Sequence, residues 1–180
     1  KQSAALWGST HVSQVWRNNI ALNNRVETGT GFGLAFYKAS TTSTLTSNNN
    51  DLYVPTHANS FIGRVGTTNY ATLTDWRTLT YDLASVSFNQ QFRAGTDLRI
   101  DTLLGTPVNN IGVPIPRVTA DIDNQVRSTT TPDPGVDEFN APAFNVHDIG
   151  VTSLARTAAN DSPVSSQPSP RETPAHVVQT

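Results

Sequence analysis

Large apolar residues recur at every second position over short stretches of this chain, and that period is typical of β-strands. The clearest case is residues 31–38 (GFGLAFYK), and shorter ones lie at 16–24 and 96–105. Gly, Asn or Pro residues separate these stretches and predict turns between short strands. Helical spacing is found only in 71–86, where frequent Thr leaves a short helix and an irregular excursion equally open. The pattern predicts an all-β fold.

A loose repeat of about thirty residues links several of these strands. The stretches 17–24 and 47–54 each set an Asn-rich turn against a short apolar strand, and 108–116 repeats the Asn-Asn-Ile element. Such repeats favour a β-solenoid, in which each coil buries its apolar face against the next one. Equivalent Asn side chains at the bends are then expected to form a hydrogen-bonded ladder along the axis. A β-sandwich also explains short alternating strands and stays open as the alternative.

The composition changes after the strand-rich part of the chain. We expect residues 1–139 to hold the coils and a C-terminal cap, and residues 140–156 to form a linker with a single strand at 146–154. Residues 157–180 are rich in Ser, Pro and Thr and have almost no large apolar side chains. Such a segment cannot bury enough surface to offset its chain entropy, so it is predicted to be a disordered tail.

Composition narrows the class of protein further. About three residues in ten are Thr, Asn or Ser and only 14% are charged, so the chain is polar without being highly charged. The net charge of −2 and the presence of only two lysines, Lys1 and Lys38, argue against a nucleic-acid partner, which needs clustered basic residues. The absence of cysteine excludes disulfides, thiolate zinc sites and Cys nucleophiles. No apolar run reaches the roughly 18 residues of a membrane-spanning helix.

Three sequence elements resemble the C-terminal coils of right-handed parallel β-helix domains in large secreted surface proteins of Bacteroidetes-type bacteria. They are VWRNNIALNN (15–24), GTGFGLAFYKASTTSTLTSNNNDLYV (29–54) and ADIDNQVRSTTTPDPGVDEF (120–139), the last following a D-x-D-x-x-x-R, polar loop, P-D-x-G-x-D-E-F pattern. The resemblance covers about residues 6–139. Residues 146–154 further resemble the first strand of an Ig-like module.

This resemblance implies a right-handed parallel β-helix fragment, type IX-like export, and a usually non-catalytic stalk or recognition domain outside the cell. Pro134 departs from the family pattern, which more often has an aliphatic residue there. Proline removes one backbone donor and therefore puts strand pairing at this position in doubt.

The acid-rich segment 121–139 has two interpretations. Asp121 and Asp123, beside Asn124, have the oxygen-rich character of a calcium site, but the spacing does not match an EF-hand. The favoured interpretation is a structural cap over the last coil, whose free backbone groups must be hydrogen-bonded. The charged residues expected to do this are Arg127, Asp133, Asp137 and Glu138. No cofactor other than calcium is predicted.

Polysaccharide lyases and hydrolases also occur on β-helices, so an enzymatic role is the alternative. A hydrolase needs two carboxylates across a groove, and Asp97 and Asp101 share a strand face at even spacing. Arg99 lies between them, which makes a solvated charged face the simpler interpretation. The four histidines have no metal-ligand spacing: His11, His57, His147 and His176. No catalytic residue is predicted.

Aromatic residues are the remaining binding candidates. A strip that stacks on sugar rings is predicted at Tyr37, Tyr53 and Trp76. Tyr37 is out of phase with the apolar face of residues 31–38, so its side chain is expected to face solvent. Four more aromatic residues could extend this strip: Trp7, Trp16, Tyr70 and Tyr81. Core packing or stacking beneath an excursion is the simpler explanation for most of the seven.

The sequence therefore predicts a non-enzymatic, extracellular or cell-surface domain of adhesin-like type, with a polysaccharide or surface glycan as its expected partner. The alternative is a remnant of a polysaccharide-active enzyme whose catalytic coils lie upstream. The chain contains no methionine and no signal-like segment, so we expect a mature chain or an excised piece of a longer one. An uncovered N-terminal coil would then offer a strand edge for self-association.

Overall fold

The computed structural model of the protein describes residues 2–103 and 105–144, which belong to one compact unit, Lys1–Phe144. The strand predicted at 146–154 and the tail predicted at 157–180 lie outside the described residues.

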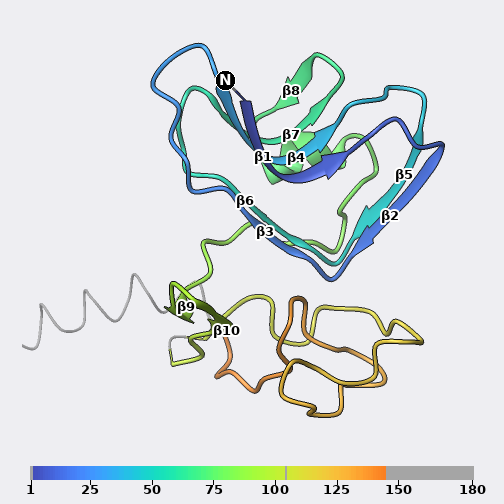
Figure 1. Ribbon diagram of the computed structural model, residues 1–180, viewed down its shortest axis with the longest axis vertical. Helices are drawn as coiled ribbons and strands as arrows, with labels where there is room; N and C mark the ends of the chain where they lie inside the picture. Colours follow the sequence, from blue (N-terminus) through green and yellow to red (C-terminus); the bar gives the residue numbers. More distant parts are fainter. Residues whose placement is uncertain (1, 104, 145–180) are drawn as a thin grey trace, which may run out of the picture. The chain divides into compact units, whose positions relative to one another are not determined.

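Short strands make up nearly all the regular structure of the described residues (Figure 1). The strands are β1 (Gln2–Gly8), β2 (Ser13–Arg17), β3 (Ile20–Leu22), β4 (Phe32–Lys38), β5 (Thr44–Asn48), β6 (Asp51–Tyr53), β7 (Ser60–Val65), β8 (Thr68–Tyr70), β9 (Phe92–Ala94) and β10 (Asp97–Ile100), and the helix is α1 (Leu73–Arg77).

The strands form four small sheets. The largest has the order β1-β4-β7-β8, and the other three are the pairs β2–β5, β3–β6 and β9–β10. The β1–β4, β4–β7, β2–β5 and β3–β6 pairs are parallel, whereas β7–β8 and β9–β10 are antiparallel. In the parallel pairs the partners are about thirty residues apart, as with Gln2 and Phe32 or Ile20 and Asp51.

These sheets show that the prediction of a right-handed parallel β-helix fragment with a C-terminal cap is wrong. The sheets are small, separate and mixed, and none of them closes. Among the described residues after β8, the only strands are the antiparallel hairpin β9–β10. The stretch 108–116, expected to be a further repeat strand, forms turns and irregular backbone, and Pro114 and Pro116 lack the N–H groups that a central strand needs. The segment 121–139 therefore has no solenoid to close.

Several local predictions are confirmed within this different arrangement. Strand β4 forms where 31–38 predicted it, and the similar stretches 17–24 and 47–54 contain the paired strands β3 and β6. Strict alternation fails in β4, because Leu34, Ala35 and Phe36 are all fully buried. β4 lies between β1 and β7 in the largest sheet, so it is covered more completely than a half-exposed strand.

Asn residues shape the bends of the first two repeats. Asn18 and Asn49 both have left-handed backbone, with φ of 56° and 58°, a conformation that Asn tolerates better than most residues. Each is followed by a second Asn, and these two residues are hydrogen-bonded to each other: Asn19 Nδ2 donates to Asn50 Oδ1 at 3.0 Å. Asn50 Nδ2 in turn donates to Asp82 Oδ1 at 2.8 Å, so a chain of polar side chains runs through the buried bends.

Helix α1 occupies part of the ambiguous stretch 71–86. Thr72 and Asp75 form a capping box at its start, since the Asp75 N–H donates to Thr72 Oγ1 and the Thr72 N–H donates to Asp75 Oδ2, each at 3.0 Å. The helix ends at Arg77, and irregular backbone follows it. The first half of this stretch therefore contains the short helix, and the second half is the irregular excursion.

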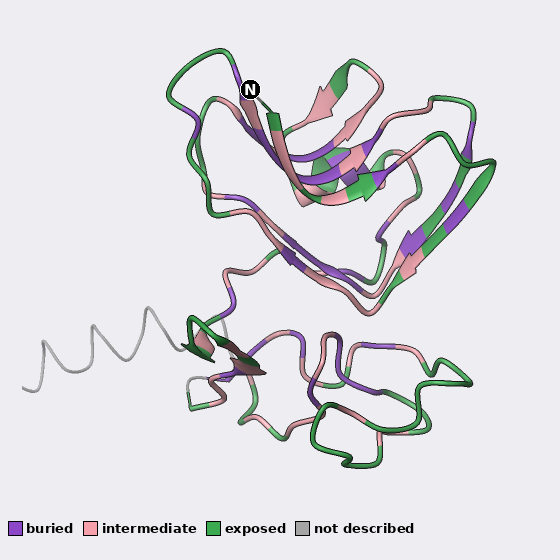
Figure 2. Ribbon diagram, viewed as in Figure 1, coloured by how far each residue is buried: buried purple, intermediate pink, exposed green. Residues whose placement is uncertain are grey.

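Trp76 of α1 is the largest fully buried side chain. Its ring centroid lies 5.7 Å from that of Phe36, 5.6 Å from that of Tyr70 and 5.4 Å from that of Tyr81. Figure 2 shows buried residues along strands such as β4 and also in the loops that follow β10, while exposed residues dominate the β9–β10 hairpin. One aromatic cluster thus joins the helix to the four-stranded sheet.

Gly63 of β7 tests this packing. A Cβ atom at this position would overlap the Trp76 ring, so Gly63→Ala should lower the free energy of unfolding by about 1–3 kcal/mol through overpacking. The matched control is Gly29→Ala, since nothing lies within 4 Å of a Cβ there, and its effect should be below about 0.5 kcal/mol. Urea unfolding of the three proteins measures both values, and equal stabilities of the two variants would contradict this packing.

Asp51, at the start of β6, provides a second test. Its carboxylate accepts hydrogen bonds from the Phe88 N–H and from Gln90 Nε2, both at 2.8 Å. Burial raises the pKa of Asp51 from 3.8 to about 7, and these two hydrogen bonds only partly oppose the shift.

The raised pKa predicts that stability falls as the pH rises. Between pH 4 and pH 7 the unfolded chain has released the Asp51 proton while the folded chain still holds it, so folding becomes less favourable by an amount on the order of a few kcal/mol. Asp51→Asn stays neutral, and its stability relative to the natural protein should increase from pH 5 to about pH 7 and level off above it. Urea titrations across that range measure the difference, and a constant value would refute the assignment.

Candidate functional site

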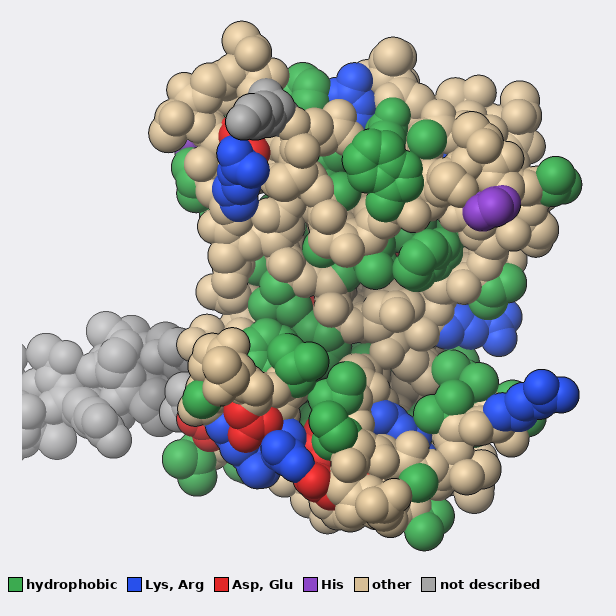
Figure 3. Space-filling view, in the orientation of Figure 1, with side chains coloured by type: hydrophobic (Ala, Val, Ile, Leu, Met, Phe, Trp, Pro, Cys, Tyr) green, Lys and Arg blue, Asp and Glu red, His purple; other side chains and the backbone are tan. Residues whose placement is uncertain are grey.

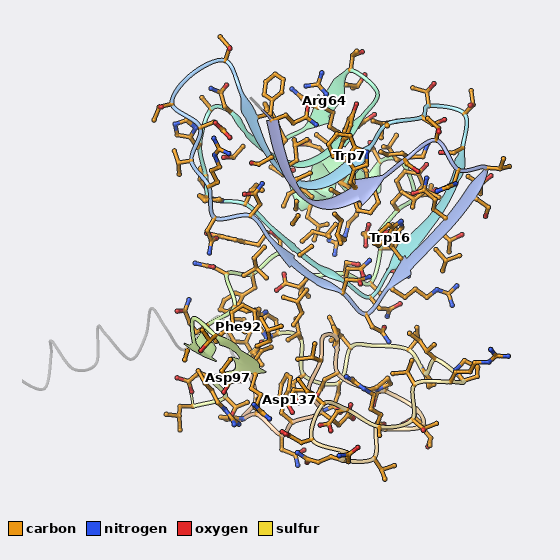
Figure 4. All side chains as sticks on the ribbon, in the orientation of Figure 1. Trp7, Trp16, Arg64, Phe92, Asp97 and Asp137 are labelled. Carbon is orange, nitrogen blue, oxygen red and sulfur yellow. The ribbon has the colours of Figure 1, made fainter. Side chains whose placement is uncertain are left out.

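Four residues form a row across the four-stranded sheet. Trp7 in β1 pairs with Tyr37 in β4, Tyr37 pairs with Arg64 in β7, and Arg64 pairs with Asn69 in β8. Side chains at paired positions on neighbouring strands project from the same face of a sheet. Figure 4 shows Trp7 and Arg64 on the same side of this sheet. These residues, Trp7, Tyr37, Arg64 and Asn69, are called the four-residue row below.

In the aromatic half of the row, Trp7 is exposed and Tyr37 is half-buried. The rings of Trp7 and Tyr37 meet edge to face, with centroids 4.9 Å apart and an interplanar angle of 88°. This geometry is favourable for aromatic pairs and fixes both rings. Trp7 is 58% exposed, and it is the only exposed large hydrophobic residue in the four strands of this sheet.

The basic half of the row is held in place by local contacts. Arg64 Nε donates to the Gly66 carbonyl at 3.0 Å, and Arg64 Nη1 donates to Asn69 Oδ1 at 3.2 Å. The guanidinium carbon lies 4.6 Å from the centroid of the Phe32 ring, a cation–π contact. These contacts use two of the five guanidinium N–H donors, so Arg64 is oriented while retaining donors for a ligand.

The four strands that carry the row supply no acidic side chain to balance Arg64. Strands β1, β4, β7 and β8 contain no Asp or Glu, and Arg64 takes part in no ion pair among the described residues. In Figure 3 hydrophobic side chains gather over this sheet beside a basic one. The row therefore combines aromatic rings with an unneutralised positive charge.

The structure separates the three residues predicted to stack on sugars. Tyr37 belongs to the four-residue row. Tyr53 is half-buried in β6, where it pairs with Leu22 in a different sheet. The expectation for Trp76 is wrong, because its ring is fully buried and its Nε1 group donates to Asp82 Oδ2 at 2.8 Å. Helical spacing indicated a helix here but not which of its faces would be covered.

Sequence reasoning did not single out Arg64 or Asn69, and it favoured core packing for Trp7. The sequence RVGTTN (64–69) did contain a signal for Arg64 and Asn69, because a Gly at a short turn is typical of a β-hairpin. Gly66 has a left-handed φ of 56°, and the hairpin register then places Arg64 opposite Asn69. The pairing of Trp7 with Tyr37 depends on a parallel contact 30 residues apart, which the residues alone do not specify.

The predicted cap residues hydrogen-bond backbone groups inside their own segment. Arg127 donates from Nη1 to the Asp133 carbonyl and from Nη2 to the Gly135 carbonyl, both at 2.8 Å. Glu138 accepts from the Ser128 N–H at 2.9 Å and from the Asp133 N–H at 3.1 Å. These hydrogen bonds hold together the two ends of the polar loop between Arg127 and Glu138. The role of both side chains is therefore structural.

Two further acids of this segment are buried. Asp133 is fully buried and accepts from the Asn110 N–H at 2.5 Å and from the Phe139 N–H at 2.8 Å. Burial raises the pKa of Asp133 to about 6 despite these donors. Burial also raises the pKa of Asp137, with a contribution from the nearby Asp121. Neither group is placed to meet a ligand.

The two residues predicted to bind calcium have protein partners. Asp121 accepts from the N–H groups of Asp123 and Gln125 at 2.8 Å and from that of Glu138 at 3.0 Å. Burial works against it, but these donors lower the pKa of Asp121. Asp123 forms a two-point ion pair with Arg99, which lowers the pKa of Asp123. In the described part of the chain, no three His, Asp or Glu residues are grouped to hold a metal together.

The carboxylates considered for catalysis also have local partners. Asp97 accepts from the Arg99 N–H at 3.0 Å and from Arg99 Nη1 at 3.1 Å, and Asp101 accepts from the Leu103 N–H at 3.1 Å. This arrangement matches the solvated charged face expected from the sequence. Within residues 2–103 and 105–144, no helix is long and apolar enough to pass through a membrane.

Comparison with known proteins gives no relative: no family model, curated protein or solved structure matches this chain. The resemblance to secreted surface proteins of Bacteroidetes-type bacteria therefore stays a prediction.

The contacts of Asp121 and Asp123 predict how the protein responds to calcium. A cation could bind Asp123 only by displacing the Arg99 guanidinium, so we expect millimolar calcium or a chelator to shift the melting temperature by less than about 1 °C. Thermal melts with calcium, with magnesium as the control, and with chelator measure this. A calcium-specific rise of several degrees that Asp121→Asn abolishes would assign a calcium site to these residues instead.

Proposed function

We propose that this chain is a non-enzymatic carbohydrate-binding domain and that a polysaccharide binds along the four-residue row. The observation that carries the proposal is the in-register alignment of the exposed Trp7 ring with Tyr37, Arg64 and Asn69. The row offers an apolar ring face at one end and fixed hydrogen-bonding groups at the other.

A sugar needs both kinds of contact. The C–H groups on one face of a sugar ring pack on aromatic rings, while its hydroxyl groups must exchange hydrogen bonds with water for hydrogen bonds with the protein. Trp7 and Tyr37 supply the first contact, and the guanidinium and amide groups of Arg64 and Asn69 supply the second. Because local contacts already orient these side chains, binding loses little further side-chain entropy.

A protein partner has weaker support. A stable protein interface commonly buries more than about 1,000 Å² around an apolar centre. Trp7 is the only exposed large hydrophobic residue in the four strands, and Val15 of β2 adds one more beside it, so the surface offers few apolar anchors. A single exposed ring suits one sugar unit of a chain better than the centre of a protein interface.

The same proposal places the domain outside the cell or on its surface. Its support is the cysteine-free composition, rich in Thr, Asn and Ser, together with the resemblance described above. An enzymatic role has less support, because Asp97 and Asp101 are each bound to a neighbouring group rather than paired across a groove.

Substitution of Trp7 tests the proposal. Removal of a central aromatic contact should weaken polysaccharide binding about tenfold or more, so Trp7→Ala should lose most of the retardation seen in affinity gels. Suitable gels contain dextran, xylan, galactan or polygalacturonate. Val126→Ala is the matched control, because Val126 is also an exposed apolar residue, 80% accessible, but lies in the segment 121–139, outside the four-stranded sheet.

Two outcomes would contradict the proposal. The first is that none of these polysaccharides retards the protein, or that the Trp7 and Val126 variants behave alike. The second concerns the non-enzymatic part of the proposal: release of reducing ends or of unsaturated products from any of the polysaccharides would show an activity. Capture of a protein instead of a glycan would favour the alternative partner.

A further inference from the structure

We infer that the four-residue row selects acidic polysaccharides and that Arg64 binds the anionic group of the sugar. This inference rests on the proposed function and names the class of its ligand. Its basis is that Arg64 is held in place by two hydrogen bonds and has no ion-pair partner among the described residues.

The positive charge of Arg64 has no ion-pair partner in the described part of the chain. Arg64 is in no ion pair among the described residues, and β1, β4, β7 and β8 contain no acidic residue. Three other arginines are paired with acids: Arg25 with Glu27 at 2.8 Å, Arg99 with Asp97 and Asp123, and Arg127 with Glu138 at 3.5 Å. Arg64 is therefore a local positive site on a chain whose net charge is −2.

The donors of Arg64 are only partly used. The Nε group is committed to the Gly66 carbonyl and one Nη1 proton to Asn69 Oδ1, while Nη2 has no hydrogen bond to another described residue. A guanidinium recognises carboxylate and sulfate groups by donating from two nitrogen atoms at once. The Nη1 and Nη2 groups at the free end of Arg64 retain that capacity.

The guanidinium is also held in position before a ligand arrives. Its central carbon lies over the Phe32 ring, 4.6 Å from the ring centroid, and the hydrogen bond to Asn69 restricts its rotation. An anion that meets a fixed donor pair requires no ordering of a long flexible side chain, so more of the contact energy contributes to affinity. Tyr37 lies between Arg64 and Trp7 in the register, so the anion-binding end and the stacking end belong to one continuous surface.

The test compares charged and uncharged forms of the same sugar chain. The intact protein is titrated with polygalacturonate and with its methyl ester, and with dextran sulfate and dextran. We expect each acidic form to bind about tenfold more tightly than its neutral counterpart at low salt, as one charge-assisted hydrogen bond would provide. The ratio between polygalacturonate and dextran sulfate distinguishes carboxylate from sulfate as the preferred anion.

Variants of Arg64 assign this difference to one residue. Arg64→Gln should abolish the preference for the acidic form while neutral binding persists, and Arg64→Lys, which keeps the charge, should restore part of the preference. Arg17→Gln is the matched control, since Arg17 is an exposed arginine in β2, and it makes the same change in net charge. Its preference should equal that of the natural protein.

The two proposals fail in different ways. Equal binding of acidic and neutral forms, or an unchanged preference in Arg64→Gln, overturns the assignment of an acidic ligand and leaves carbohydrate binding intact. Absence of binding to any of the four polysaccharides overturns both. Melting temperatures of the Arg64 variants accompany the titrations, and if Arg64→Gln is unstable, the Arg64→Lys result and the charged-to-neutral ratio of the natural protein decide.

Discussion

The carboxylate of Asp82 is the acceptor on which the packing of the sheets and the helix most depends. This fully buried group accepts hydrogen bonds from Asn50 Nδ2 and Trp76 Nε1, both at 2.8 Å, and from Ser85 Oγ at 2.6 Å. A carboxylate removed from water is tolerated only when such donors replace its hydration. The donors come from the bend before β6, from α1 and from the loop after it, so one group holds three segments in a fixed relation.

That constraint reaches the candidate binding surface through β7. The Trp76 ring, oriented by its bond to Asp82, occupies the space beside Gly63, which pairs with Phe36 in β4. Successive residues of a strand project to opposite sides, so Gly63 on the inner side leaves Arg64 on the outer side. The position of the half-buried Arg64 side chain therefore follows from packing in the core, and at position 63 this packing requires a residue without a side chain.

Local features of the chain were predictable from the sequence, whereas their assembly was not. The period-two pattern located β4, and the Asn-rich bends located the paired strands β3 and β6, because both depend on neighbouring residues. The predicted solenoid required similar pairing to continue through 108–116, but prolines and turns interrupt it there. For the candidate site, parity placed Tyr37 on an exposed face. The contribution of Arg64 depends on the register of a hairpin, and that of Trp7 depends on a parallel contact between distant strands.

Charged groups in this molecule serve two different purposes, and their hydrogen bonds distinguish them. Asp121 and Asp133 attract attention in the sequence, yet both accept bonds from backbone N–H groups of their own segment or its neighbour. A group whose bonding capacity is used by the fold has little left for a ligand. Arg64 is inconspicuous in the sequence, but it is anchored by two donors and retains three. A charge that is fixed in place, unpaired and partly unbonded is the better indicator of a binding site than a dense cluster of acids.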